Sequence, residues 1–367
     1  MNRVLASMAF AACLFPASVL AEEDDRRRGE GPRPLIEGEF EVGLSSDWIV
    51  RSDDPDAEIL DLYPEAELTV TFNPAQWLAF NLGLTLEPVL DPLPSVDRYF
   101  GDVGLYVDTL NVQVDLGNLN LTGGKFAPGF GMAWDVTPGV YGTEYAEDYE
   151  LAEMIGFGAA YAIDAGGAGT ITLGGNVFYL DDTFLSDSAF TRRGRNTVAA
   201  GGPGNTGRLD NFSFTLDGSD IPSIEGFSWH LGYVHLSAGP GDISDVNGFA
   251  AGLAKETELD SGITLGVNGE VAVFDGYNGA NDDAVYVTGG LSFANGPWHG
   301  EAAATMRQVR YFGGGRDNDF MAQLSAGYEF DNGVDLSAGY GFFREGGEAS
   351  HALGLRLSKS FAFEIAR

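Results

Sequence analysis

The sequence predicts an all-β protein, a transmembrane antiparallel up-and-down β-barrel of about sixteen strands. Three observations support this fold class. Apolar and polar residues alternate with a period of two, as in residues 319–330, 334–343 and 352–363. The connections between such segments are alternately short and long, and aromatic residues gather at the segment ends. A strand of a membrane barrel alternates in this way because one face meets lipid and the other meets water.

Residues 1–21 are expected to be a secretory signal peptide and not part of the barrel. Arg3 supplies a positive start, an apolar run follows, and Val19-Leu20-Ala21 fits a cleavage site. A membrane anchor, or a lipoprotein site at Cys13, is the alternative for this segment. Residues 22–35 are charged and contain Pro and Gly, so we expect a flexible periplasmic leader. Cleavage would remove Cys13, the sole cysteine, which leaves neither disulfides nor thiol chemistry.

The barrel domain is expected to occupy residues 36–367. Its strands are predicted at 36–50, 62–72, 77–87, 99–114, 119–126, 153–164, 170–180, 209–217, 225–237, 246–257, 262–274, 284–294, 298–312, 319–330, 334–343 and 352–363. Even-numbered connections are predicted to be short periplasmic turns; Asn332-Gly333, for example, accepts the positive φ of a hairpin turn. Odd-numbered connections are longer and acidic, and they are predicted to be extracellular loops.

A soluble sandwich would also alternate along each strand, but it has no reason to keep this asymmetry of loop lengths through so many hairpins. Aromatic residues near strand ends further favour two interfacial girdles. They are Trp48, Trp77, Trp298, Tyr328, Phe330, Tyr340, Phe342, Phe361 and Phe363.

Charge excludes one class of function. The chain has 54 acidic and 20 basic residues, a formal net charge of −34. Nucleic acid is not an expected partner, because phosphate contacts need clustered lysines and arginines. No segment after the signal peptide forms a long uninterrupted apolar run, so no transmembrane helix is expected.

A barrel of about sixteen strands leaves an aqueous channel. The inward positions are mostly small or polar, so we expect an open, hydrated pore without a packed plug. Solvated charges on the predicted wet face are expected to favour cations or neutral solutes, although simple solvation of these groups is the alternative. The expected pore-lining residues are Glu39, Glu41, Glu67, Asp102, Glu301, Arg307, Glu329, Asp335 and Arg356.

Two long loops could constrict the pore. The first, residues 127–152, is favoured by its position between the fifth and sixth strands, and Arg307 and Arg356 are expected to face it across the constriction. Its candidate residues are Asp135, Glu144, Glu147, Asp148 and Glu150. The second, residues 181–208, is rich in arginine and could instead contact lipopolysaccharide phosphates. No spacing is diagnostic of a metal site, and no cofactor is expected.

The run Gly123-Gly124-Lys125-Phe126-Ala127-Pro128-Gly129-Phe130-Gly131 resembles a stretch of Gram-negative porins of the phosphate-selective and siderophore-porin type. The resemblance implies a 16-stranded pore that is often trimeric. Phosphate selectivity does not carry over, because the chain has only three lysines, Lys125, Lys255 and Lys359. The last strand, at Phe361 and Phe363, resembles the terminal signal read by the barrel-assembly machinery.

We therefore expect a porin in the outer membrane of a Gram-negative bacterium, passing small hydrophilic solutes or ions by passive diffusion. Outer-membrane lipid, lipopolysaccharide and the assembly machinery are expected partners, and a homotrimer is possible. The alternatives are a lipid hydrolase that uses His235 and Ser237, or a structural or adhesive barrel. A structural barrel predicts no single-channel conductance.

Overall fold

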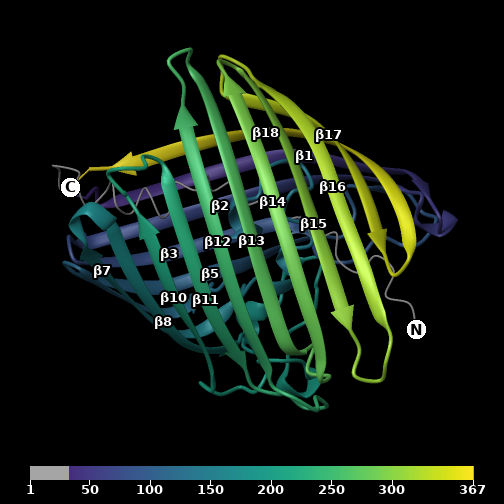
Figure 1. The fold of residues 1–367 in the computed structure, drawn as a ribbon, viewed down its shortest axis with the longest axis horizontal. Helices are drawn as coiled ribbons and strands as arrows, with labels where there is room; N and C mark the ends of the chain where they lie inside the picture. Colours follow the sequence, from purple (N-terminus) through teal and green to yellow (C-terminus); the bar gives the residue numbers. More distant parts are fainter. Residues whose placement is uncertain (1–32, 367) are drawn as a thin grey trace.

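The computed structural model describes residues 33–366, and they form one closed antiparallel barrel of sixteen long strands (Figure 1). Neighbouring strands are joined up and down in sequence order, as predicted. The long strands are β1 (Ile36–Ser52), β2 (Leu60–Ala75), β3 (Leu78–Pro88), β5 (Val103–Leu116), β6 (Leu119–Phe126), β7 (Met154–Asp164), β8 (Thr170–Leu180), β10 (Asn211–Ser219), β11 (Phe227–Leu236), β12 (Val246–Glu258), β13 (Ile263–Tyr277), β14 (Asp282–Asn295), β15 (Trp298–Arg310), β16 (Arg316–Glu329), β17 (Val334–Glu345) and β18 (Glu348–Ile365).

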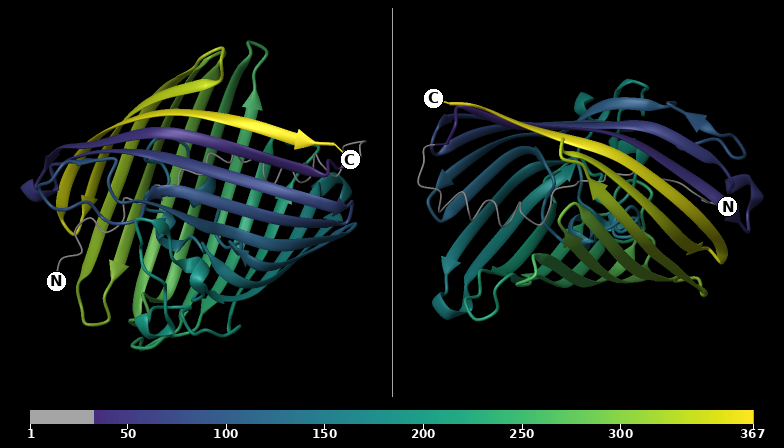
Figure 2. Two further views of the ribbon diagram at one scale, coloured as in Figure 1. Left: turned by 180° about the vertical axis from the view of Figure 1, so that it is seen from behind. Right: turned by 90° about the horizontal axis from the view of Figure 1, so that it is seen from above.

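The first and last strands close the barrel. β1 pairs with β18 from Ile36↔Ile365 to Ser52↔Ser350, with one register shift after Ile49. In hydrocarbon, unpaired backbone N–H and C=O groups cost several kcal/mol each, so a spanning sheet must close on itself. Both views in Figure 2 show β1 beside β18.

Two short strands hold outer connections against the wall. β4 (Arg98–Tyr99) pairs in parallel with β2, and β9 (Ala189–Phe190) pairs with β5. The expected strand at 99–114 therefore splits, because Phe100 and Asp102 adopt positive φ between β4 and β5.

The barrel has two ends, which we call the terminal rim and the loop rim. The terminal rim carries Ile36, Ile365 and the short turns, such as the one at Gly333 with φ of +74°. The loop rim carries the longer connections. The expectation that all of these are long is wrong for the late hairpins, since residues 278–281, 311–315 and 346–347 are short turns. The strands there extend further than their apolar alternation indicates.

The outward face is apolar, as the alternation predicts. Leu324 is 65% exposed and Trp298 is 60% exposed, although both are large apolar side chains. At the terminal rim, aromatic rings contact one another, with Trp298 and Tyr328 centroids 4.8 Å apart and Tyr328 and Phe330 centroids 5.0 Å apart. Such a ring cluster at a strand end is typical of an interfacial girdle.

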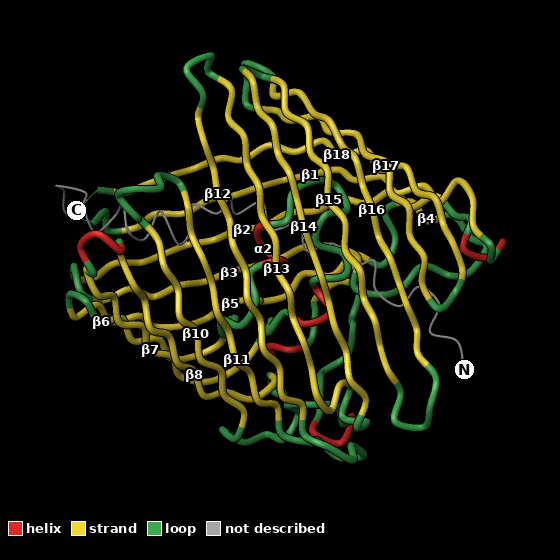
Figure 3. The backbone as a smooth tube through the Cα atoms, in the orientation of Figure 1, coloured by secondary structure: helices red, strands yellow, loops and turns green. Residues whose placement is uncertain are grey.

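The connection between β6 and β7 folds into the barrel. We call residues 127–153 the inner loop; it contains α2 (Ala133–Val136) and a 3₁₀ turn, Glu147–Tyr149. Figure 3 draws α2 inside the outline of the barrel. Phe130 and Tyr149 pack with Phe274 and Tyr286 of the wall, and Tyr141 packs with Phe343 on the other side.

The expectation of a pore without a packed plug is therefore wrong, although the loop that enters the bore is the one favoured as a constriction. The inner loop fills part of the lumen with a buried aromatic core, because inward aromatics from separate strands meet there. Period-two alternation showed which residues point inward but not that they would touch one another.

Part of the expected domain division lies outside the described residues. The proposed signal peptide, 1–21, and most of the leader are not included in residues 33–366. The end of the leader is tied to the barrel, since the Leu35 N–H donates to the Ile365 carbonyl at 2.8 Å. Within residues 33–366, no helix has both the length and the hydropathy needed to cross a membrane.

A charge on the outward face tests the lipid-facing assignment. Leu324→Arg, midway along β16, is expected to lower the free energy of unfolding in lipid vesicles by about 2–4 kcal/mol. Leu93→Arg is the control, because Leu93 is 70% exposed but lies in an outer connection and not in a strand. Urea titration measures both variants. Equal stability of the two would contradict the assignment.

Candidate functional site

Glu270 of β13 anchors the first part of the inner loop to the wall. Its carboxylate accepts the backbone N–H groups of Met132 at 2.6 Å and Ala133 at 3.2 Å, and the Tyr149 hydroxyl at 2.7 Å. These donors start and close the buried part of the loop. Hydrogen bonds to a charged group are worth about 1.5–3 kcal/mol each, so this carboxylate holds the loop strongly.

Further contacts follow the loop across the barrel. His230 hydrogen-bonds the Phe130 carbonyl, and the Gln323 side chain donates to the Pro138 carbonyl at 3.0 Å. Gly232 permits the first contact, because a Cβ there would lie 1.9 Å from the Phe130 oxygen. The loop can therefore approach the wall this closely only because the wall residue at that point has no side chain.

Arg307 of β15 fastens the last part of the loop. Its guanidinium pairs with Asp148 at 2.7 Å, with Asp319 at 2.9 Å and with Glu345, and lies 4.6 Å from the centroid of the Tyr145 ring. Arg307 was expected to face the loop across a gap, and that expectation is wrong. The guanidinium contacts the loop directly and forms ion pairs with three carboxylates.

These anchors leave free space on the opposite side of the loop. A cavity of about 310 Å³ lies between the loop and strands β1, β2, β3 and β5. A second cavity of about 680 Å³ extends along the same strands toward the terminal rim. Glu67, Asp108 and Thr109 line both cavities, so the two adjoin. We call them together the passage.

The passage is lined by carboxylates on both sides. Trp134 of the loop and Tyr106 of the wall add aromatic surface, and Arg356 lies beside Ser45 and Glu65. The wall and the loop contribute Glu39, Glu41, Glu65, Glu67, Glu87, Asp108, Asp135, Glu150 and Glu153.

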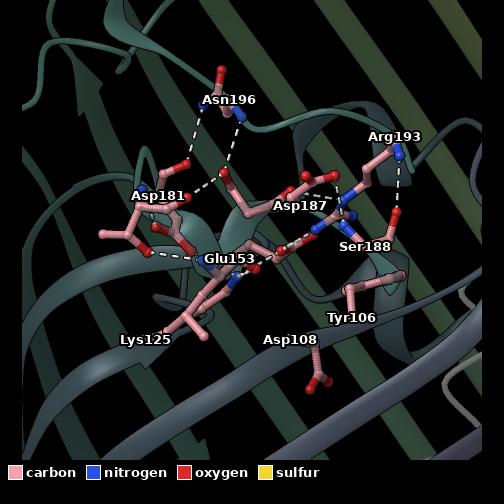
Figure 4. Close-up of polar contacts among 12 residues, drawn as sticks. Tyr106, Asp108, Lys125, Glu153, Asp181, Asp187, Ser188, Arg193 and Asn196 are labelled. Atoms are coloured by element: carbon pink, nitrogen blue, oxygen red, sulfur yellow. Dashed lines mark hydrogen bonds and ion pairs between the residues drawn. The ribbon is translucent and has the colours of Figure 1, made fainter. Parts of the chain in front are cut away.

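Nearby cations are already neutralised (Figure 4). Lys125 is buried and donates to Glu153 at 2.7 Å and to Asp181 at 2.8 Å. Arg193 pairs with Glu153 at 2.6 Å and lies 4.0 Å from the centroid of the Tyr106 ring. Asp108 stands apart from this network.

Across residues 33–366, no ion pair is formed by four carboxylates of the passage: Glu67, Asp108, Asp135 and Glu150. Negative charge therefore remains in the passage after the pairs have been counted.

Burial raises the pKa values of several loop carboxyls. It raises the pKa of Asp135 to about 6, and burial together with neighbouring carboxylates, Asp135 among them, raises the pKa of Glu150 to about 7. Burial also raises the pKa of Glu147 to about 8, against the hydrogen bond from Thr143. Burial, with Glu147 and Asp47 nearby, holds the pKa of Glu144 well above its usual value. The negative charge of the loop consequently grows with pH between about 6 and 8.

The structure brings together only part of the expected pore-lining set. Glu39, Glu41, Glu67 and Arg356 line the passage, as do Asp135 and Glu150 of the loop. Glu144, Glu147 and Asp148 lie elsewhere on the same loop.

The remaining expected residues lie apart from the passage. Asp102 precedes β5 and is paired with Arg98, so its placement within a strand is wrong. Glu301 and Asp335 each contact one ring nitrogen of His299, with the Glu301 oxygen 2.5 Å from Nδ1 and the Asp335 oxygen 2.8 Å from Nε2. Glu329 is exposed at the terminal rim, opposite Asp335 in register.

Three wall carboxylates of the first cavity of the passage were missing from the expected set: Glu65, Glu87 and Asp108. Glu65 and Glu87 follow the alternation of their strands and could have been found from it. Asp108 could not, because a register shift between β3 and β5 leaves it as an extra residue between Val107 and Thr109 and so breaks the alternation.

The expected hydrolase pair does not form a catalytic contact. The Ser237 hydroxyl donates to the Asp210 carbonyl at 3.0 Å, and the His235 ring bonds the Asn247 side chain at 3.0 Å and stacks on Phe212. Among the described residues there is also no group of three or more His, Cys, Asp or Glu side chains arranged to hold a metal ion.

Neither a protein-family model nor a curated protein matches the sequence. Solved structures do match the fold. The outer membrane channel DcaP of Acinetobacter baumannii has a TM-score of 0.59 at 11% identity, over 89% of this chain and 97% of that one. OpdK of Pseudomonas aeruginosa, solved with vanillate, has a TM-score of 0.56 at 10% identity, over 89% and 99%.

OmpT, an outer membrane protein of Vibrio cholerae solved in a trimer form, has a TM-score of 0.54 at 13% identity, over 89% and 99%. At such low identities the likeness concerns the fold. The expected resemblance to 16-stranded outer-membrane barrels is confirmed at that level.

Loss of the Glu270 carboxylate tests the anchoring of the loop. Glu270→Ala leaves the N–H groups of Met132 and Ala133 and the Tyr149 hydroxyl without an acceptor, so we expect a loss of about 2–4 kcal/mol in unfolding free energy. We also expect faster proteolytic cleavage within residues 127–153, measured by mass spectrometry. Glu256→Ala, an exposed residue of β12, is the matched control. Unchanged cleavage in Glu270→Ala would show that the loop is held by other contacts.

Proposed function

We propose that this protein is an outer-membrane channel for passive diffusion of small hydrophilic solutes, and that it favours cations. The observation that carries the proposal is the passage, a pair of adjoining cavities lined by strands β1, β2, β3, β5 and β18, the first of which also borders the inner loop. The barrel fold, shared with outer-membrane channels, supports the placement of this passage across a membrane.

Charge supports the preference for cations. Carboxylates lie on both sides of the passage, and of its two lining cations among residues 33–366, Arg33 pairs with Asp115 and Arg356 has Glu65 beside it. At an effective dielectric constant of about 20, unit charges about 4 Å apart attract by roughly 4 kcal/mol. About 1.4 kcal/mol of net advantage suffices for tenfold selectivity. Trp134 adds an aromatic ring of the kind that attracts organic cations.

The location and partners follow from the same proposal. The protein is placed in the outer membrane of a Gram-negative bacterium after removal of residues 1–21, with the terminal rim toward the periplasm. The barrel-assembly machinery, outer-membrane lipid and lipopolysaccharide are its proposed partners. The trimer form of OmpT supports a homotrimer. A structural barrel, the alternative, would conduct no ions.

Removing charge from the passage tests cation preference. In planar bilayers with a KCl gradient, the wild-type reversal potential is expected to indicate that K⁺ permeates better than Cl⁻. Glu67→Gln with Asp108→Asn is expected to lower the permeability ratio severalfold, because both carboxylates line both cavities. Asp164→Asn with Glu225→Gln, at terminal-rim turns, removes the same charge elsewhere and is the control. A chloride preference in the wild type would refute the proposal.

The loop carboxyls predict a pH dependence. As pH rises from about 5 to 8, Asp135 and Glu150 lose protons, since their pKa values are about 6 and about 7. Negative charge is added to the passage, so the K⁺/Cl⁻ permeability ratio is expected to rise. The double variant Asp135→Asn/Glu150→Gln is expected to flatten this rise. A ratio that falls with pH would contradict the assignment of these groups to the passage.

A further inference from the structure

Outward-facing cationic side chains gather on one sector of the barrel, at the loop-rim ends of β15, β16, β17 and β1. The strand alternation places them on the outer face. Exposed Met306 and Arg310 share a face of β15, and exposed Leu324 and Arg316 share a face of β16. The same alternation applies on β17 and β18, and on β1 the register shift after Ile49 turns Arg51 to the outward face, opposite His351. The members of this cationic sector are Arg51, Arg310, Arg316 and Arg344.

Register brings these residues side by side. Arg310 is directly opposite Arg316, and Arg51 is directly opposite His351. Arg344 is opposite Ala349, two residues from His351, and is therefore its diagonal neighbour. Side chains so related lie about 5–8 Å apart at Cβ. The like charges of Arg310 and Arg316 repel one another at this spacing unless an anion lies between them, and the His351 side chain lies between Arg51 and Arg344.

The protein supplies part of the anionic charge in this sector. Arg310 pairs with Asp283 at 3.0 Å, and the Asp53 carboxylate accepts the N–H of Ala349, the residue opposite Arg344, at 3.0 Å. Arg51, Arg316 and Arg344 are exposed, and none of them makes an ion pair with any residue between 33 and 366. In a chain with a net charge of −34, unpaired arginines in one sector are a pronounced departure from the average surface.

The sector lies at the height of a lipid headgroup. Trp48, Phe320 and Phe342 flank it on the outward face, and the Arg344 guanidinium lies 6.0 Å from the centroid of the Phe342 ring. Aromatic residues mark the boundary between hydrocarbon and headgroups. Guanidinium groups just beyond that boundary match phosphate oxygens in a bidentate manner.

Other strands do not repeat the pattern. At the loop-rim ends of β10, β11 and β12 the outward residues are Phe212, His235 and Asn247, none of them an arginine or lysine, and on β13 Asp275 is outward and exposed. The arginines are therefore confined to one sector of the loop rim and are not spread evenly around the barrel.

We propose that the cationic sector binds the phosphate groups of a phosphorylated glycolipid of the outer leaflet. The proposal rests on the placement of the barrel in an outer membrane, but not on conduction through the passage. Arg51, Arg316 and Arg344 bind the phosphates, and the acyl chains lie along the apolar surface below them.

Lipid titration of the folded protein in detergent tests the proposal. Native mass spectrometry is expected to show diphosphoryl lipid A bound at least about tenfold more tightly than the same lipid without phosphates. The triple variant R51Q/R316Q/R344Q is expected to lose this preference. The control R192Q/R195Q/R208Q, which removes three positive charges from the outer connection between β8 and β10, is expected to keep it.

Folding is checked by the heat-dependent shift of the barrel on electrophoresis. If the triple variant does not fold, R316Q and R344Q alone are each expected to weaken binding about threefold. Equal binding of both lipids by the wild type, or full binding by the folded variants, overturns the proposal. Displacement of lipid A by an equal concentration of inorganic phosphate overturns the assignment to a lipid. Single-channel recording on the same preparations reports separately on conduction.

Discussion

Backbone pairing is the constraint on which the rest of this structure depends. A sheet in hydrocarbon must satisfy every N–H and C=O within itself, and the pairing of β1 with β18 achieves this by closing the barrel. Closure fixes the register of every strand, and the register fixes which side chains share the interior. The positions of Glu270, Asp108 and Arg307 inside the barrel, far apart in sequence, follow from it.

Inside the barrel, packing and charge are divided between two sides. The inner loop packs Phe130, Tyr141 and Tyr149 against the wall from β12 to β18, where Glu270 and Arg307 hold it. This packing leaves the opposite side, along β1 to β5, to water and carboxylates. Because the cations nearest the passage are used in ion pairs, the unpaired charge that remains is negative.

The sequence predicted the strands and their faces well and the interior contacts poorly. β6 and β8 have the predicted bounds, because apolar alternation and turn residues are local signals. The direct contact of Arg307 with Asp148 depends on a loop and a strand that are 159 residues apart, and no local pattern carries that information. Asp108 was not predicted to line the pore, because a bulge in β5 breaks the alternation of inward and outward residues on which the prediction depended.

The central claim is that a water-filled, negatively charged passage lies beside the inner loop, and thiol labelling tests it most directly. Thr109→Cys places a thiol where the two cavities adjoin and leaves all carboxylates in place. In the barrel inserted in vesicles, a cationic methanethiosulfonate reagent is predicted to react with this thiol much faster than an anionic one of the same size. A thiol that reacts with neither reagent, or faster with the anionic one, would contradict the claim.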